Sequence, residues 1–366
     1  MKKLLMFVNS MDAYGGIERV IANLSDKLSY YYDVTILVKD EPISAYKLNE
    51  KVKLESINTK LNMNMNSRFN RICSLPINIC KSVDALKRYL KKNSFDYVYV
   101  AFVINGLEVY LANKCYRERI VASEHASYYA YNSVYKKIKE WLYPRLKAIS
   151  VPTTMDTQIY REKRYNAYYI PHMTTYNVTK CNELKSKKCI NVGRLTSDKQ
   201  QKLLLEIWKL VNEKMEKDDW TLQIIGSGEE EENIKAKIIE LGLENVEMIP
   251  HTNEIRKYYE EASLFLLTSK MEGFGMVLLE ALSFGIPCIS FDCPSGPRDI
   301  VQDDVNGYLI PCYDITKYSK QIKKYMNLSE DERRRLGNGA INTIKQWDNA
   351  KILKQWISLF NMLDNE

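Results

Sequence analysis

Residues 264–291 read LFLLTSKMEGFGMVLLEALSFGIPCISF. The apolar run at 264–267 predicts a buried strand, and a similar run at 288–291 predicts another. Between them, the apolar residues from 276 to 284 are spaced as in a helix that covers a sheet. A strand, a helix and a strand in this order predict a βαβ unit, so the two strands are expected to be parallel.

The same alternation extends along almost the whole chain. Strands are predicted at 4–8, 34–38, 97–100, 120–123 and 149–152 in the first half, and at 189–192, 222–225, 246–249, 264–267 and 288–291 in the second. Helices are predicted between them, among others at 17–28, 201–217, 230–241 and 276–284. This pattern predicts an α/β fold with two doubly wound, Rossmann-like parallel-sheet domains.

A polar stretch at 174–188, rich in Asn, Thr, Lys and Ser, separates the two series of strands. We therefore expect one domain at 1–178 and a second at 179–346. The remaining residues, 347–366, have the apolar spacing of an amphipathic helix, and we expect this helix to pack back onto the first domain.

The composition is that of a soluble globular protein, with 45% hydrophobic and 27% charged residues. There is no apolar run of about 18 residues, so a transmembrane helix is not expected. The first apolar run is too short for a signal peptide, which favours a cytoplasmic protein. The eight cysteines form no Cys-x-x-Cys pair and are expected to be reduced, and three histidines are too few to predict a histidine metal centre.

The net charge of +7 is unevenly distributed, because residues 1–180 carry a balance of +12 and residues 181–366 one of −5. The first half therefore either faces an anionic partner or simply has a basic, soluble surface. No nucleic-acid-binding module is recognisable, so nucleic acid is not an expected partner.

Four glycine-rich turns follow predicted strands and precede helices. Gly15 and Gly16 allow a close backbone approach to a ligand, or they form a tight turn only. Gly193 is followed by Arg194 and Lys199, two cations that suit a diphosphate unless both are merely solvated. Gly226 begins a weaker glycine turn that can admit a nucleobase.

The segment around Gly275 is the most specific of these turns. Glu272 lies in the glycine-rich loop, and Glu280 lies within an apolar helix, where a buried carboxylate needs a partner such as a sugar hydroxyl. The amides at the helix start are expected to face an anion. The alternative places Glu280 on an exposed stripe of a core helix. His125, at the end of a strand, is either catalytic or structural.

Taken together, these residues resemble the retaining family-4 glycosyltransferases of the GT-B fold, over nearly the whole chain and in the family's order. The segment from Gly15 to Arg19 is similar to the family's Gly-Gly-x-Glu-Arg motif, and Glu272 and Glu280 match its Glu-x₇-Glu motif. Gln200, where the family usually has Gly, and His172, where many members have Asn, depart from its pattern.

The resemblance implies a metal-independent enzyme without a cofactor, whose two domains face each other across a cleft, the first on the acceptor side and the second on the donor side. It implies transfer of a hexose or N-acetylhexosamine from a nucleotide-diphosphate sugar, by default a UDP-sugar, to a saccharide. The catalytic residues implied are His125, Glu272, Arg194 and Lys199. The donor-binding residues implied are Gly15, Gly16, Gly193, Gly226, Phe274, Gly275, Met276, Val277 and Glu280.

The acceptor side contains two basic helical segments. The predicted helix at 133–143 carries Lys136, Lys137 and Lys139 among aromatic residues, and 83–92 is a second candidate. Such helices suit an anionic lipid surface, so a polyprenyl-linked acceptor and peripheral membrane association at the inner face are expected, unless both are ordinary surface helices.

Two other functions fit the same fold. One is a nucleotide-sugar 2-epimerase, which needs acid and base groups for proton transfer at C2. The other is a non-catalytic nucleotide-sugar-binding subunit. The spacing of the motifs favours sugar transfer over both, in a bacterial polysaccharide or glycoconjugate pathway.

Overall fold

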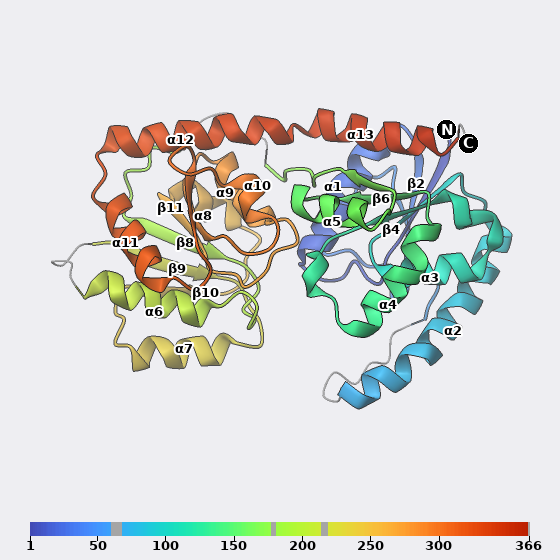
Figure 1. Cartoon of the computed structure of the whole chain (residues 1–366), viewed down its shortest axis with the longest axis horizontal. Coiled ribbons are helices and arrows are strands. Elements are labelled where there is room, and N and C mark those ends of the chain that lie inside the picture. The colour runs from blue at the N-terminus through green and yellow to red at the C-terminus, as the bar shows by residue number, and fades with distance from the viewer. Residues whose placement is uncertain (60–67, 177–180, 214–218, 365–366) are drawn as a thin grey trace. The chain divides into compact units, whose positions relative to one another are not determined.

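The computed structural model describes residues 1–59, 68–176, 181–213 and 219–364 (Figure 1). The chain divides into two compact units. The first comprises Met1–Met173 together with Asn349–Glu366, and the second comprises Thr174–Asp348. Each contains one parallel sheet with helices between its strands, which confirms the predicted fold class.

The sheet of the first unit has the order β3-β2-β1-β4-β5-β6-β7, and all of its pairings are parallel. The strands are β1 (Lys3–Phe7), β2 (Asp33–Val38), β3 (Lys53–Ser56), β4 (Tyr97–Val100), β5 (Ile120–Ser123), β6 (Ala148–Val151) and β7 (Ala167–Tyr169). The order reverses between β1 and β4, as in a doubly wound sheet.

The helices of the first unit are α1 (Gly16–Leu28), α2 (Arg68–Lys92), α3 (Val103–Ala112), α4 (Ser133–Leu142), α5 (Thr154–Glu162) and α13 (Asn349–Met362). Short 3₁₀ helices occur at Lys114–Arg119, Tyr128–Ala130 and Tyr143–Arg145. Helices α2 and α3 lie against each other, as do α3 and α4, and α1 contacts α13.

The C-terminal helix α13 packs on the first unit through an aromatic cluster. The ring centroids of Phe360 and Tyr97 are 5.1 Å apart, and those of Phe360 and Tyr32 are 5.6 Å apart. Trp356 lies against Tyr99 on β4, with centroids 5.5 Å apart. The apolar face of α13 therefore completes the core of a domain whose other residues lie more than 170 positions earlier in the chain.

The sheet of the second unit has the order β10-β9-β8-β11-β12-β13, again entirely parallel. Its strands are β8 (Lys188–Val192), β9 (Thr221–Ile225), β10 (Val246–Ile249), β11 (Leu264–Leu267), β12 (Cys288–Phe291) and β13 (Gly307–Ile310). Its helices are α6 (Gln201–Asn212), α7 (Glu231–Glu240), α8 (Ile255–Glu261), α9 (Met276–Ser283), α10 (Pro297–Ile300), α11 (Ile315–Met326) and α12 (Glu330–Ile344), with a 3₁₀ turn at Lys345–Trp347. The order reverses between β8 and β11.

All ten strands predicted from the sequence are present, with ends that shift by at most one residue. Three further strands, β3, β7 and β13, were not predicted. Strands β3 and β7 are short edge or near-edge strands with polar or half-buried residues, and β13 begins with a glycine. The predicted helix 83–92 is the end of the longer α2, which contains Pro76, a residue that normally ends a helix. Helix α6 was predicted to reach residue 217, and positions 214–217 lie outside the described residues.

Candidate functional site

The loops that follow β8 and β11 meet where the strand order of the second unit reverses. The Thr268 hydroxyl donates to the carbonyl of Lys199 at 3.3 Å, and the amide of Lys270 donates to the carbonyl of Asp198 at 2.8 Å. In open α/β sheets, such a reversal at the carboxyl ends of the strands is where ligands bind. Two of the predicted motifs, although about 70 residues apart, thus lie side by side.

Lys199 and Glu272 are in direct contact at this edge. The Lys199 ammonium lies 2.6 Å from Oε1 of Glu272, and the Ser269 hydroxyl donates to the same oxygen at 2.6 Å. The backbone of Glu272 is held by Pro294 and Ser295, with its amide donating at 2.9 Å and its carbonyl accepting at 3.2 Å. Two residues predicted to be catalytic are therefore brought together, and the segment after β12 supports them.

Arg194 extends from the loop after β8 with an exposed side chain. Its carbonyl accepts from Nε2 of Gln201 at 3.1 Å, which fixes the loop. Within the described part of the chain, its guanidinium makes no hydrogen bond or ion pair. A cation so placed is available to an anionic ligand.

Gly226 and Gly228 are required by the packing of this edge, whereas a Cβ at Gly193 would meet only Cε of Lys199, at 4.0 Å. A Cβ at Gly226 would lie 1.9 Å from the carbonyl oxygen of Gly193, and one at Gly228 would lie 2.2 Å from that of Leu195. The turn after β9 therefore packs directly on the loop after β8. Its glycines have a steric reason that does not depend on a nucleobase.

Helix α9 begins at Gly275, whose φ of 97° lies in the left-handed region that favours glycine. Gly275 has no side chain to cap the helix, and the amides of Met276 and Val277 have no hydrogen-bond partner among the residues that the structure describes. The positive end of the helix dipole adds to these free donors. The start of α9 is thus suited to a phosphate group.

Phe274, predicted to contact the donor, has a buried side chain that packs on Trp347 with ring centroids 6.5 Å apart. A Cβ at Gly296 would lie 1.8 Å from the carbonyl oxygen of Phe274, so the two backbones are in close contact. The aromatic ring is part of the core of the second unit. Only the main chain of Phe274 is placed to line a site at the start of α9.

Glu280 is buried on the second turn of α9. It accepts hydrogen bonds from the Tyr259 hydroxyl at 2.9 Å and from the Thr175 hydroxyl at 3.3 Å. The alternative interpretation, in which Glu280 lies on an exposed stripe, is therefore wrong. The protein itself supplies partners to this carboxylate, a point that the sequence did not reveal.

The glycine pair of the first unit follows β1, next to the reversal of that sheet. Gly15 caps α1, and the carboxylate of Glu18 folds back over it, so that a Cβ at Gly15 would lie 2.1 Å from Oε2 of Glu18. A Cβ at Gly16, in contrast, would meet no described atom within 4 Å. A side chain at position 15 would thus have to displace the flexible carboxylate of Glu18, whereas the space in front of Gly16 is open.

His125 follows β5, and its imidazole lies between two aromatic neighbours. Its Nε2 is 2.9 Å from the hydroxyl of Tyr99, and its ring stacks on that of His172 with centroids 4.9 Å apart and planes inclined by 17°. Nδ1 of His125 is buried without a hydrogen-bond partner in the described residues. Burial lowers the pKa of His125 to about 4, so the imidazole is neutral at pH 7.

Glu124, the residue before His125, is the centre of a buried network that sequence reasoning missed. Its carboxylate accepts from Lys139 at 2.7 Å, from the Tyr131 hydroxyl at 2.9 Å and from the Tyr143 hydroxyl. Lys139 also donates to the Tyr160 hydroxyl at 2.6 Å. The adjacency of Glu124 to His125 was the available signal, but nothing in the sequence showed which hydroxyls would converge on it.

Lys139 had been predicted to lie with Lys136 and Lys137 on a basic surface of α4, and this prediction is wrong. Its side chain is buried, and burial lowers the pKa of its ammonium despite the neighbouring Glu124 carboxylate. Position 139 lies on the helix face that contacts the unit, whereas Lys137 is exposed and Lys136 is half-buried. Only the latter two remain on the surface.

No three His, Cys, Asp or Glu side chains are grouped at metal-binding distance in residues 1–59, 68–176, 181–213 and 219–364. Over the same ranges, no helix combines the length and the apolar composition that a membrane span requires.

Two family models match the chain, one in each half. The model described as Glycosyltransferase Family 4 matches residues 14–172, and the model described as Glycosyl transferases group 1 matches residues 179–343. An amylovoran biosynthesis glycosyltransferase of Erwinia amylovora is 28% identical over 99% of this chain and 100% of its own length.

A Campylobacter jejuni protein, named as an α-1,4-N-acetyl-D-galactosaminyltransferase of a PP-undecaprenol-linked saccharide, is 25% identical over 100% of both chains. The crystal structure of HepE from Anabaena with UDP and glucose superposes with a TM-score of 0.78 at 16% identity, over 99% of this chain and 100% of that one. At this identity the likeness shows the fold. With a matching model on each of its two parallel-sheet units, the chain belongs to the family-4 glycosyltransferases of the GT-B fold.

Proposed function

We propose that this glycosyltransferase is a retaining enzyme that moves a hexose or N-acetylhexosamine from a nucleotide-diphosphate sugar to a saccharide acceptor in bacterial surface-polysaccharide synthesis. The observation that carries the proposal is the contact of Lys199 with Glu272 beside the uncapped start of α9. A cation for phosphate and a carboxylate for sugar hydroxyls are side by side there.

The leaving diphosphate is stabilised by charge in this proposal. As the bond between sugar and phosphate breaks, negative charge grows on the phosphate oxygens. Arg194, Lys199 and the amides of Met276 and Val277 are positive groups at the same edge of the sheet, on loops whose backbone is held by hydrogen bonds. Groups on a backbone held in this way need little reorganisation to stabilise a developing anion, so we propose that the enzyme needs no metal ion or other cofactor.

Lys199 must exchange partners when the donor binds. In the free protein its ammonium is neutralised by Glu272, and a phosphate offers a stronger anionic partner. Once Lys199 turns to the phosphate, Glu272 gains free acceptor capacity for the hydroxyls of the transferred sugar. Glu280 is buried and accepts hydrogen bonds from the hydroxyls of Tyr259 and Thr175, and we propose that it also accepts one from the donor ribose.

His125 acts as a neutral group in this scheme. Since its pKa is about 4, the imidazole carries no charge at pH 7 and contributes hydrogen bonding rather than electrostatic attraction. The unpartnered Nδ1 is available for a sugar hydroxyl if the ring rotates or the ligand reaches it. We propose that the acceptor hydroxyl attacks on the face that the diphosphate leaves, which retains the anomeric configuration.

UDP is the nucleotide that we propose for the donor. HepE, which shares the fold, was crystallised with UDP and glucose. The relatives from Erwinia amylovora and Campylobacter jejuni are named for amylovoran biosynthesis and for transfer to a PP-undecaprenol-linked saccharide. They support a polysaccharide pathway and a lipid-linked acceptor, which implies a cytoplasmic enzyme that works at the inner face of the membrane.

A patch on α3 and α4 supports peripheral membrane association. Leu107, Lys137, Ile138 and Trp141 line an apolar depression there. Trp141 is exposed, and the guanidinium of Arg145 lies 4.6 Å from the centroid of its ring. An exposed indole beside cations is suited to the head-group region of an anionic bilayer. Co-sedimentation with anionic liposomes at low salt tests this: Trp141→Ala should reduce it, and equal binding of both proteins would contradict the membrane proposal.

The transfer reaction is tested with purified protein and a panel of UDP- and GDP-sugars in the presence of EDTA. Nucleotide release from one donor, lost on Arg194→Ala, is the expected result. Analysis of the sugar product without acceptor separates transfer from a 2-epimerase, which would change the configuration at C2. Binding of a donor with no release, even when a lipid extract is supplied as acceptor, would favour a non-catalytic subunit.

A further inference from the structure

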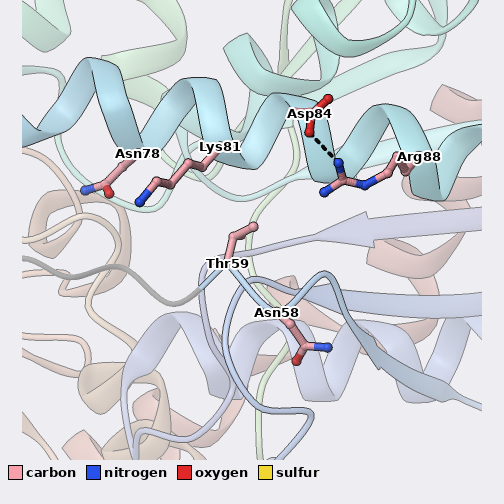
Figure 2. Close-up of a pocket in the computed structure, with 6 residues that line it drawn as sticks. All are labelled: Asn58, Thr59, Asn78, Lys81, Asp84 and Arg88. Carbon is pink, nitrogen blue, oxygen red and sulfur yellow. Dashed lines mark hydrogen bonds and ion pairs between the residues drawn. The ribbon is translucent and has the colours of Figure 1, made fainter.

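The first unit contains a cavity of about 310 Å³ that none of the proposed donor-site residues lines. Six residues line it: Asn58, Thr59, Asn78, Lys81, Asp84 and Arg88. Asn58 and Thr59 follow the carboxyl end of β3, and the others lie on α2, which faces this loop (Figure 2). In a doubly wound sheet the carboxyl ends of the strands are the edge at which ligands bind.

Two polar atoms at this cavity are buried and unsatisfied. Oγ1 of Thr59 and Nδ2 of Asn78 have no hydrogen-bond partner in the part of the chain that the structure describes. Thr59 is held in place by its amide, which donates to the carbonyl of Lys39 at 2.6 Å. A buried N–H or O–H group without a partner is rare in proteins and is normally satisfied by water or a ligand. Both groups here can donate to an oxygen atom.

The cavity also has a free positive charge. Asn78, Lys81, Asp84 and Arg88 recur at intervals of three or four residues and so share one face of α2. Arg88 forms an ion pair with Asp84, as Figure 2 shows, whereas the Lys81 ammonium has no ion-pair partner among the described residues. The lining therefore has a net positive charge, and Lys81 carries it.

We propose that this cavity binds a phosphate group of the acceptor. A phosphate accepts several hydrogen bonds and carries negative charge, which matches the Asn78 amide, the Thr59 hydroxyl and the Lys81 ammonium together. A neutral sugar hydroxyl would leave the charge of Lys81 unused. In calling the ligand an acceptor, this inference rests on the proposed function.

The position of the cavity indicates what kind of contact it makes. Strand β3 is two strands away from β1, at which the sheet order reverses, a distance of about 10 Å at the usual strand spacing. The phosphate thus lies away from the reacting hydroxyl and serves recognition rather than chemistry. It belongs either to the diphosphate that joins a saccharide to a lipid or to a phosphodiester within a polymer chain.

Direct binding measurements test the proposal. Isothermal titration calorimetry of the full chain, with saturating UDP present to occupy the proposed donor site, would use farnesyl diphosphate, a glycerol-phosphate oligomer and uncharged maltotriose. We expect one phosphate-bearing probe to bind more tightly than maltotriose. Lys81→Ala should weaken it by about tenfold, the usual loss for a charge-assisted hydrogen bond. Binding of farnesyl diphosphate alone would identify a lipid diphosphate, and binding of the oligomer alone a phosphodiester.

Two further variants make the result specific. Lys87→Ala removes an exposed cation of α2 that does not line the cavity, and it should bind the probe as the natural protein does. Thr59→Val removes the unsatisfied hydroxyl at nearly constant volume. This variant should bind the phosphate-bearing probe more weakly, and its midpoint of thermal unfolding should not fall.

The proposal is overturned if neither phosphate probe binds better than maltotriose, or if Lys81→Ala and Lys87→Ala have the same effect. No sugar transfer is involved in these titrations. Specific probe binding in a protein that releases no nucleotide would therefore contradict the proposed function alone, and nucleotide release without probe binding would contradict this inference alone.

Discussion

Two lysine–glutamate ion pairs of this chain have nearly the same contact distance but differ in how far their side chains are exposed to solvent. The pair Lys139–Glu124 has an N–O distance of 2.7 Å with side chains 4% and 2% exposed, and Lys199–Glu272 has 2.6 Å with 27% and 8%. Glu124 also accepts two tyrosine hydroxyls, whereas Glu272 accepts one serine hydroxyl. The first pair is enclosed by its own domain, and the second lies at a sheet edge where a ligand can replace one partner.

The comparison shows that contact distance alone does not tell what an ion pair does. A fully buried pair costs desolvation and is tolerated only when hydrogen bonds satisfy its remaining atoms, as the tyrosines do for Glu124. A partly exposed pair has less to lose when it opens. We therefore interpret Lys139–Glu124 as a support for the loop that carries His125, and Lys199–Glu272 as a pair that opens on donor binding.

The largest effect is expected from Lys139→Met. This substitution leaves Glu124 as a buried carboxylate without its cation, which costs about 3–5 kcal/mol in the free energy of unfolding. Urea denaturation followed by circular dichroism measures it. Lys137→Ala, at an exposed position of the same helix, is the matched control and should change little. A loss below about 1 kcal/mol would mean that the pair is not the support described here.

Lys199→Ala should separate activity from stability. Nucleotide release should fall by about 10²–10³-fold, the usual loss when one group that stabilises a developing anion is removed. The free energy of unfolding should fall less than in Lys139→Met, because the Lys199 side chain is 27% exposed and the Ser269 hydroxyl still donates to Glu272. Lys202→Ala, which removes the exposed partner of Glu230, is the control. If Lys199→Ala lowered the free energy of unfolding as much as Lys139→Met does, the two pairs would not differ as described here.

The pH dependence of stability should reveal the buried imidazoles of the first unit. The unfolded chain takes up a proton at His125 below its ordinary pKa of 6.5, whereas the folded chain does so only near its lowered pKa of about 4. The free energy of unfolding should therefore fall as the pH drops through this window, and His172 acts in the same direction. His125→Asn, which cannot titrate, should lose less stability between about pH 7 and pH 4.5. If His125→Asn and the natural protein lose the same free energy of unfolding over this pH range, as measured by urea denaturation, His125 is not a buried neutral group.

The smallest effect on stability is expected from Gly16→Ala. The new methyl group meets no described atom, so the midpoint of thermal unfolding should not fall, whereas the KM for the donor should rise if the glycine loop faces it. Gly226→Ala is the contrasting variant, because its Cβ would overlap the carbonyl oxygen of Gly193 and cost about 1–3 kcal/mol. An unchanged KM for the donor in Gly16→Ala would show that the first glycine loop does not line the donor site.

Continuous apolar runs were sufficient to predict ten strands, since a strand that is buried on both faces leaves a clear pattern in the sequence. The edge strand β3, with the sequence Lys-Leu-Glu-Ser, is half exposed and has no such pattern. Helix α2 was predicted only in part because Pro76 interrupts its sequence signal. Burial alone does not explain the misses, because β10 is half exposed and was predicted, whereas β13 is largely buried and was missed.

The candidate site was predictable as separate motifs but not as an arrangement. The strand pattern places the loops with Arg194, Lys199 and Glu272 at one edge of the second unit, so these residues and Glu280 could be proposed from the sequence as site candidates. Their partners were not, because the contacts of Glu280 with Tyr259 and Thr175 depend on tertiary packing. The same holds for the stacking of His125 on His172 and for the burial of Lys139.

The most direct test of the account is an equilibrium titration of the protein with UDP in EDTA, by calorimetry, for the natural chain, Arg194→Ala and Arg256→Ala. Arg194 is the free cation of the proposed donor site, and Arg256 is an exposed arginine of α8 paired with Glu260. The account predicts that UDP binds without metal and that only Arg194→Ala weakens it, by about tenfold or more. Equal affinities for all three proteins would contradict the donor site proposed here.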